Sequence, residues 1–127
     1  MGLRLAYVED DEVNRLIMEH LIGGTDHELL MFPDADTTLS CAQLREIDLF
    51  VLDINLGRGN PDGVELMHRL REICSEAAFW TLTAYAAESD KARFLQVGFD
   101  AYYPKPLDHG RFLASLRSLR DKKQRLL

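Results

Sequence analysis

The sequence predicts one three-layer α/β domain, in which helices cover both faces of a parallel sheet. Short apolar runs alternate with helical segments five times along the chain, and the connections between them are short. No internal repeat, low-complexity segment or internal linker interrupts this pattern. The run over residues 49–56 is apolar at almost every position, which is typical of a strand buried on both faces.

The first third of the chain contains two predicted strands and two predicted helices. The strands are expected over residues 3–8 and 27–32. A helix from about residue 12 ends at the glycine pair 23–24. Its apolar face is predicted from four residues at helical spacing: Val13, Leu16, Ile17 and Leu21. A second helix, capped by Asp34 or Asp36, is expected to run to about residue 45.

The rest of the chain is expected to form three more pairs of strand and helix. The strands are the run that carries Asp53, residues 77–83 and residues 101–103. Asp62 is the predicted N-cap of the third helix, and Gly98 ends the fourth, which covers residues 86–97. Apolar residues recur at helical spacing in the third helix and in the last, which starts near residue 108: Val64, Met67, Leu70 and Cys74, then Phe112, Leu116 and Leu119.

Length, charge and composition restrict the class of protein. A chain of 127 residues is expected to form a single domain, with the basic residues 120–127 as a linker toward an absent output domain. The net charge of −6 argues against direct nucleic-acid binding. No apolar run reaches the roughly 20 residues of a membrane span. Cys41 and Cys74 stand outside any CxxC pattern and no signal peptide precedes the first strand, which together predict a cytoplasmic protein without disulfides.

Polar residues follow the predicted strands at their carboxyl ends, the edge at which parallel sheets bind ligands. Glu9 and Asp10 follow the first strand, Asp53 the third, Thr83 ends the fourth and Lys105 follows the fifth. If the first and third strands are neighbours, three carboxylates converge. Two like charges about 4 Å apart repel by roughly 4 kcal/mol at an effective dielectric of about 20. A proton or a cation relieves that repulsion, and hard oxygen ligands favour Mg²⁺, or Mn²⁺ in its place.

This set of groups suits phosphoryl transfer. A divalent cation, the ammonium of Lys105 and the hydroxyl of Thr83 can neutralise and position a phosphoryl group beside Asp53. Asp53 is then the attacking carboxylate, and the product is an acyl phosphate. The chain contains neither GxxxxGK[ST] nor GxGxxG, so the phosphoryl group is expected to come from another molecule.

These residues resemble the receiver domain of two-component response regulators, and the likeness covers essentially the whole chain from residue 3 to the last helix. Five motifs carry it: Val8-Glu9-Asp10-Asp11-Glu12, Leu52-Asp53, Asp62-Gly63-Val64-Glu65-Leu66, Leu82-Thr83-Ala84 and Lys105-Pro106. The resemblance implies a flavodoxin-like (βα)5 sandwich with a five-stranded parallel sheet of order 2-1-3-4-5. It also implies a cis peptide bond between Lys105 and Pro106.

The resemblance assigns the acidic residues their roles. Asp53 matches the phosphoacceptor. Glu9 and Asp10 match the acidic pair that binds Mg²⁺ together with Asp53, and the backbone carbonyl of Asn55 is a further ligand. Asp11 directly precedes the first helix, so it is interpreted as a helix N-cap with an accessory role toward the metal through water.

Three other residues match the switch of the family. Thr83 corresponds to the switch hydroxyl, Tyr102 to the switch aromatic and Lys105 to the lysine that contacts the phosphate. The loop over residues 53–63 is two residues longer than in most relatives, which is expected to change the surface beside the site. Tyr85 is bulky at a position that can shield the phosphoryl group from water, and we expect it to slow dephosphorylation.

The implied function is a phosphorylation switch in a two-component phosphorelay. A sensor histidine kinase or a histidine phosphotransfer protein donates a phosphoryl group to Asp53 with Mg²⁺ bound. The surface of the fourth helix, fifth strand and fifth helix then changes and controls a downstream protein or the chain's own output domain, with homodimerisation through the same surface as an option. The domain is not an enzyme beyond its own phosphorylation and autodephosphorylation.

Three other functions are alternatives to a phosphorylation switch. An aspartate-nucleophile phosphatase needs a second acid two residues after the nucleophile, and that position is Asn55. A flavin-binding flavodoxin relative needs a hydroxyl- and glycine-rich phosphate loop after the first strand, where this chain has an acidic run. A receiver that acts by binding alone, without phosphorylation, stays open as the alternative, although the complete acidic set argues against it.

Overall fold

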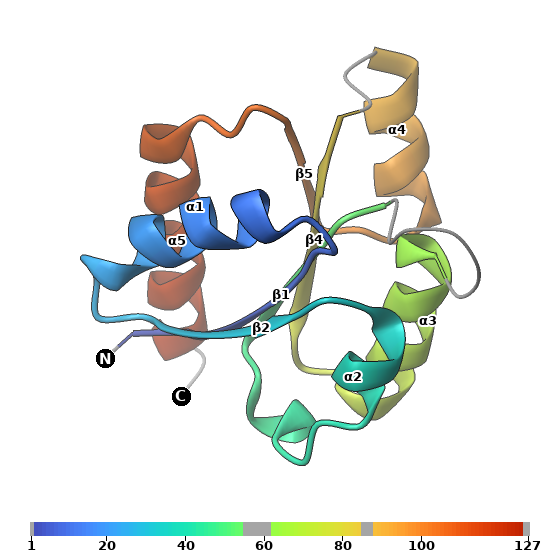
Figure 1. Ribbon diagram of the computed structural model, residues 1–127, viewed down its shortest axis with the longest axis horizontal. Helices are drawn as coiled ribbons and strands as arrows, with labels where there is room; N and C mark the ends of the chain where they lie inside the picture. The colour runs from blue at the N-terminus through green and yellow to red at the C-terminus, as the bar shows by residue number, and fades with distance from the viewer. Residues whose placement is uncertain (1, 55–61, 85–87, 126–127) are drawn as a thin grey trace.

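The computed structural model describes residues 2–54, 62–84 and 88–125. Within these residues the strands form a single parallel sheet of order β2-β1-β3-β4-β5 (Figure 1). This order is the one that the family resemblance implies, so the predicted flavodoxin-like fold is confirmed. The strands are β1 (Arg4–Val8), β2 (Glu28–Phe32), β3 (Leu49–Leu52), β4 (Ala78–Thr83) and β5 (Ala101–Pro104).

Helices cover both faces of this sheet. α1 and α5 pack on one face, whereas α2, α3 and α4 pack on the other (Figure 1). β3 lies at the centre, and all four of its residues are buried, as its apolar run predicted. The helices are α1 (Glu12–Gly23), α2 (Ala35–Leu39), α3 (Gly63–Ile73), α4 (Glu88–Val97) and α5 (His109–Arg125), and a 3₁₀ helix, η1, covers Leu44–Glu46.

The register of the central strands brings the site residues to one edge. Val8 of β1 lies beside Leu52 of β3, and the backbone N–H of Asp53 donates to the carbonyl of Val8 at 3.1 Å. Glu9 and Asp53 therefore follow neighbouring strands at the same level. On the other side of β4, the backbone N–H of Lys105 donates to the carbonyl of Thr83 at 2.8 Å.

The predicted apolar face of α1 is wrong. Val13, Leu16 and Ile17 are 62%, 57% and 44% exposed, and the residues that enter the core are Met18 and Ile22. Both sets have helical spacing, so the sequence pattern alone does not decide between them. The rotation of α1 about its axis, set by its packing on the sheet, turns the Met18 side inward. Leu21 is half-buried at the margin.

The predicted second helix is too long. α2 ends at Leu39, and the chain passes through an irregular segment before η1. The hydroxyl of Thr38 donates to the carbonyl of Asp34, and that of Ser40 donates to the carbonyl of Asp36. Hydroxyl residues that bond to nearby backbone in this way are poor helix formers, which explains the early end. Asp34, and not Asp36, is the N-cap.

Most predicted helix ends are confirmed. Asp11 caps α1 and Asp62 caps α3, each accepting a backbone N–H from the first turn of its helix. α4 is followed by Gly98 in the left-handed region, at φ 128°, and its predicted start at residue 86 lies outside the described residues. The Lys105-Pro106 bond is cis, as implied.

The structure also bears on the cysteines, on membrane spans and on the end of the last helix. The cysteines are free. Among the described helices, none has the length and apolar character needed to cross a membrane. α5 continues to Arg125. The single-domain boundary and the linker over residues 120–127 stay predictions.

Candidate functional site

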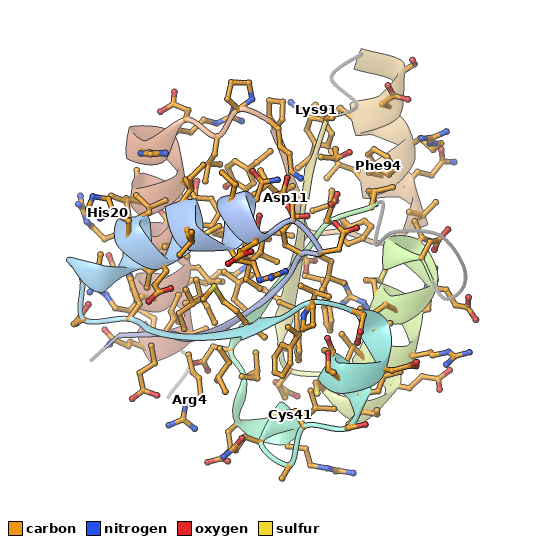
Figure 2. The ribbon with its side chains drawn as sticks, in the orientation of Figure 1. Arg4, Asp11, His20, Cys41, Lys91 and Phe94 are labelled. Carbon is orange, nitrogen blue, oxygen red and sulfur yellow. The ribbon has the colours of Figure 1, made fainter. Side chains whose placement is uncertain are left out.

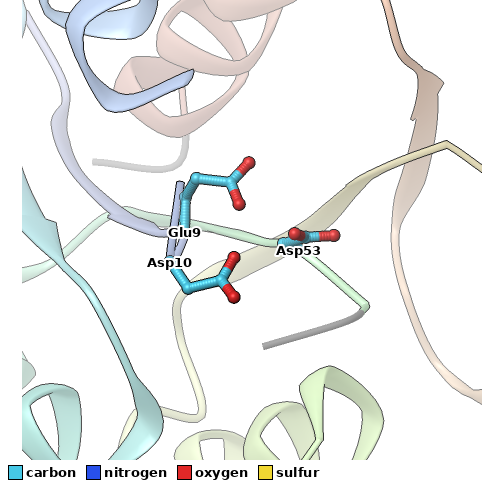
Figure 3. A group of neighbouring side chains, drawn as sticks. All are labelled: Glu9, Asp10 and Asp53. Carbon is cyan, nitrogen blue, oxygen red and sulfur yellow. The ribbon is translucent and has the colours of Figure 1, made fainter. Parts of the chain in front are cut away.

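Three carboxylates meet at the carboxyl edge of the sheet. Glu9 and Asp10 follow β1, and Asp53 follows β3 (Figure 3). Each residue offers one carboxylate oxygen, and these oxygens lie within 4.8 Å of one another. Glu9 and Asp53 are buried, at 1% and 6% exposed, whereas Asp10 is exposed. The sequence predicted this convergence from the strand ends, and the structure brings the three side chains together.

Lys105 supplies a positive charge to this cluster. Its Nζ donates to Glu9 Oε1 at 2.7 Å and lies 3.4 Å from Asp53 Oδ2. With every group ionised, three carboxylates face one ammonium, so the four side chains carry an excess of negative charge. A divalent cation would offset that excess, and the carboxylate oxygens form the hard donor set that Mg²⁺ or Mn²⁺ prefers. The residues present therefore fit such an ion.

The neighbouring charges perturb the titration of the cluster. Burial raises the pKa of Glu9, but its contacts with Asp53 and Lys105 outweigh burial and leave that pKa lowered. Burial lowers the pKa of Lys105, but the bond to Glu9 and the charges of Asp53 and Glu9 outweigh it and raise the pKa. Burial and then the adjacent Glu9 raise the pKa of Asp10. Lys105 thus stays charged, and Asp10 gains a proton more readily than usual.

The two predicted switch residues flank this site on the neighbouring strands. Thr83 is fully buried at the end of β4. Tyr102 of β5 is 7% exposed, and its ring stacks on Phe94 of α4, with centroids 5.9 Å apart and an interplanar angle of 19°. Thr83 therefore lies on the strand next to that of Tyr102, whose ring connects β5 to α4.

The remaining predicted residues divide into two groups. Asp11 Oδ1 accepts the backbone N–H of Val13 at 2.8 Å, which confirms its interpretation as the N-cap of α1. Asn55, Tyr85 and the extended part of the loop after β3 lie outside the described residues. The roles expected for them stay predictions.

Comparison with known proteins decides the family. The model of the response regulator receiver domain family matches residues 5–117. The chain belongs to the response regulator receiver domain family. This is a family of signalling domains in two-component systems.

The relatives that match the chain include a sensor protein and two response regulators. The receiver domain is 29% identical over 105 residues to the sensor protein EvgS of Escherichia coli, covering 83% of this chain and 9% of that protein. It is 28% identical over 119 residues to the response regulator MprA of Mycobacterium bovis, covering 94% of this chain and 51% of that one. The polar-differentiation response regulator DivK of Brucella ovis is 29% identical over 113 residues and is 90% covered, with 87% of this chain. The chain thus spans only a part of several relatives.

Solved structures show the same fold. A CheY-like receiver domain from Methanospirillum hungatei superposes with a TM-score of 0.81 at 21% identity, covering 98% of this receiver and 99% of that chain. The BeF3-activated receiver domain of DrrB superposes with a TM-score of 0.80 at 20% identity, covering 95% of this chain and 99% of that one. A response regulator from Burkholderia pseudomallei was solved with a phosphorylated aspartic acid and a calcium ion. It superposes with a TM-score of 0.77 at 22% identity, covering 96% of this chain and 71% of that one.

Three residues that contact Glu9 were not predicted from the sequence. The Tyr7 hydroxyl and the Asn14 side-chain amide each donate to Glu9 Oε1 at 3.1 Å, and Arg15 Nη1 donates to the backbone carbonyl of Glu9 at 2.7 Å. Tyr7 precedes Glu9 by two residues on β1, and strand residues two apart point to the same side. That spacing was a usable signal for Tyr7. No comparable local signal identified Asn14 or Arg15.

Proposed function

We propose that this receiver domain accepts a phosphoryl group on Asp53 from the phosphohistidine of a sensor histidine kinase or a histidine phosphotransfer protein. The main support is the buried Asp53 carboxylate, which lies within 4.8 Å of the oxygens of Glu9 and Asp10 and 3.4 Å from the ammonium of Lys105. A buried carboxylate with cation-binding neighbours and a fixed ammonium is equipped for attack on a phosphorylated donor.

The chemistry is a single displacement at phosphorus. A carboxylate oxygen of Asp53 forms the new O–P bond while the P–N bond to the donor imidazole breaks, and that nitrogen keeps the electron pair and takes up a proton. Glu9, Asp10, Asp53 and the backbone carbonyl of Asn55 would hold Mg²⁺ or Mn²⁺, which neutralises charge on the carboxylates and the phosphoryl oxygens. Lys105 moves its hydrogen bond from Glu9 to the phosphoryl group. Hydrolysis of the acyl phosphate resets the domain, and Tyr85 slows that step.

The proposed output is a change of the surface formed by α4, β5 and α5. Thr83 turns toward the phosphoryl group and leaves space beside Tyr102, whose ring packs on Phe94 of α4. One phosphoryl group suffices if the two arrangements differ by a few kcal/mol. The changed surface then binds a downstream protein, an output domain of the same protein or a second receiver.

The exposed side of α1 is the proposed contact for the phosphodonor. α1 begins directly after the acidic residues, so a protein bound there can bring its phosphohistidine to Asp53. The exposed residues of this side are apolar: Val13, Leu16 and Ile17. An apolar hollow between α1 and the loop after β5, lined partly by Ile17 and Pro106, continues it. Such a patch beside a reactive group suits the apolar side of a helix on the donor.

The direct test is phosphorylation by a small acyl phosphate with Mg²⁺. Intact-mass spectrometry is expected to show one added phosphoryl group on the wild type, none on Asp53→Asn, and normal addition on Asp26→Asn, which changes an aspartate at the opposite end of the sheet. If no adduct forms when EDTA is present during the reaction, phosphorylation of the protein requires the divalent cation. A wild-type protein that stays unmodified would overturn the proposal and favour a receiver that acts by binding alone.

A further inference from the structure

Glu9 is held by more donors than a single ion pair requires. Its side chain is 1% exposed. Oε1 accepts from the Tyr7 hydroxyl at 3.1 Å, from Asn14 Nδ2 at 3.1 Å and from Lys105 Nζ at 2.7 Å, and Oε2 accepts the backbone N–H of Asp11 at 3.4 Å. A carboxylate oxygen has two lone pairs, so three donors saturate Oε1. From the residues that the structure describes, Oε2 accepts one long hydrogen bond, which leaves it as the oxygen to bind a cation.

The three donors to Oε1 differ in what they do during the proposed reaction. Lys105 lies on a loop, is shared with Asp53 and is expected to turn to the phosphoryl group. Tyr7 and Asn14 are neutral, and they belong to β1 and α1. Tyr7 is 1% exposed, so its hydroxyl is held inside the domain against Glu9.

The backbone beside Glu9 is fixed from the same helix. Arg15, the residue after Asn14 on α1, donates from Nη1 to the carbonyl of Glu9 at 2.7 Å. α1 thus holds both the side chain and the main chain of this residue. Groups that orient a metal ligand in this way change metal affinity when they are removed, although they never touch the metal.

We propose that Tyr7 and Asn14 are positioning residues, which orient Glu9 for divalent-cation binding independently of Lys105 and keep it oriented when Lys105 turns to the phosphoryl group. The inference rests on the proposed function, because it assigns Glu9 as a cation ligand. The simpler interpretation treats Tyr7 as one more aromatic of the core beneath α1 and α5, and Asn14 as a half-buried helix residue. The two interpretations differ in what they predict for cation affinity.

The experiment measures Mn²⁺ binding by electron paramagnetic resonance of the free ion, in wild type, Tyr7→Phe and Asn14→Leu. Each variant removes a donor and keeps a side chain of similar size. Mn²⁺ affinity is expected to fall about tenfold in both, the lower end of the range for groups that orient metal ligands. Tyr103→Phe is the matched control, since Tyr103 is a buried tyrosine that packs on Trp80 and Phe112 in the same core cluster. Its affinity is expected to equal that of the wild type.

Phosphorylation kinetics separate positioning from damage to the fold. In Tyr7→Phe, the Mn²⁺ concentration for half-maximal phosphorylation by the acyl phosphate should rise, while the rate at saturating Mn²⁺ stays close to that of the wild type. Unfolding in EDTA reports the stability of each variant without the metal. A fall of the saturated rate with unchanged Mn²⁺ affinity would overturn the inference.

The Lys105→Met background tests independence from the lysine. The loss caused by Tyr7→Phe is expected to persist there, because the hydroxyl acts on Glu9 directly. A loss that disappears in this background would show that Tyr7 acts through Lys105. Unchanged or tighter Mn²⁺ binding in both single variants overturns the inference alone, provided that the wild type binds Mn²⁺ and is phosphorylated. A wild type that does neither overturns the proposed function as well.

Discussion

The two ends of the sheet carry similar acidic residues but differ in burial. Figure 2 labels Arg4, the first residue of β1, and Asp11, the N-cap of α1 beyond the carboxyl end of that strand. At the amino end, Arg4 forms ion pairs with Glu28 and Glu46, whose side chains are 66% and 58% exposed. At the carboxyl end, the Glu9 side chain that pairs with a lysine is 1% exposed. The carboxylates paired with Arg4 lie in water, whereas Glu9 and Asp53 are buried.

This difference separates structural charges from functional ones. Exposed ion pairs are screened by water and contribute little to stability. Buried carboxylates that outnumber their cation must take up a proton or bind an ion. Acidic residues alone do not distinguish the two ends of the sheet. What distinguishes them is that the carboxylates of the carboxyl end are buried and outnumber their lysine.

Gly63→Ala should have the largest effect, at the carboxyl end. A Cβ at Gly63 would overlap the carbonyl oxygen of Asp53 and lie 2.9 Å from Cα of Ile54. Both neighbours are backbone held between β3 and α3, so relief requires moving the site. We expect a loss of about 3 kcal/mol in the free energy of unfolding, measured with urea. The matched change is Gly2→Ala, which meets the backbone of Asp26 outside the sheet and should cost less. Equal losses would contradict the comparison.

Lys105→Met should reveal the unbalanced charge. Removing one partner of a fully buried ion pair costs about 3–5 kcal/mol. Lys105 is 22% exposed, and a carboxylate can take up a proton, so we expect about 2 kcal/mol in EDTA. Mg²⁺ should then raise the melting temperature more in this variant than in the wild type, because the lysine no longer competes for Glu9 and Asp53. Calorimetry with and without Mg²⁺ checks this, with Lys122→Met as the exposed control. An identical response to Mg²⁺ in both proteins would argue against a cation site.

His27 should give the amino end a weak dependence on pH. Its Nδ1 accepts the backbone N–H of Leu3 at 2.8 Å, and burial lowers its pKa. Above the ordinary pKa of about 6.5 the ring is neutral in both the folded and the unfolded chain, so its contribution is complete. As the pH falls from there toward the lowered value, the unfolded chain binds the proton first, and stability is lost.

The measurement for His27 is the melting temperature between about pH 7.5 and pH 5. The wild type should lose stability relative to His27→Asn, which keeps an acceptor and does not titrate. His109→Asn, at an exposed position on α5, should follow the wild type. Parallel curves for wild type and His27→Asn would contradict the assignment.

Arg4→Met should have the smallest effect. The variant keeps most of the stem and removes the ion pairs to Glu28 and Glu46, which lie 2.9 and 3.1 Å away. Because these pairs are exposed, the melting temperature should change by no more than the error of the measurement, and added NaCl should remove any difference. A loss comparable to that of Lys105→Met would show that the two ends are not as different as burial indicates.

Much of the fold and part of the site could be predicted from local patterns. Asp62 and Gly98 mark helix ends by their own chemistry, and the apolar run before Asp53 marks the central strand. The short connections of an α/β fold then carry Glu9, Asp53 and Lys105 to one edge. The length of α2 was missed because the hydroxyls of its last residues compete with the helix, an effect that depends on detailed geometry.

Local patterns specify the order and type of the elements and the acidic character of the carboxyl edge, since strand and helix periods are local properties of the chain. Tertiary packing decides which side of α1 is buried and that Asn14 donates to Glu9. Both depend on the rotation of α1 about its axis as it packs on the sheet. That rotation turns Met18 inward, leaves Ile17 outside and brings Asn14 to Glu9. It is set by contacts with residues distant in sequence, which no local pattern contains.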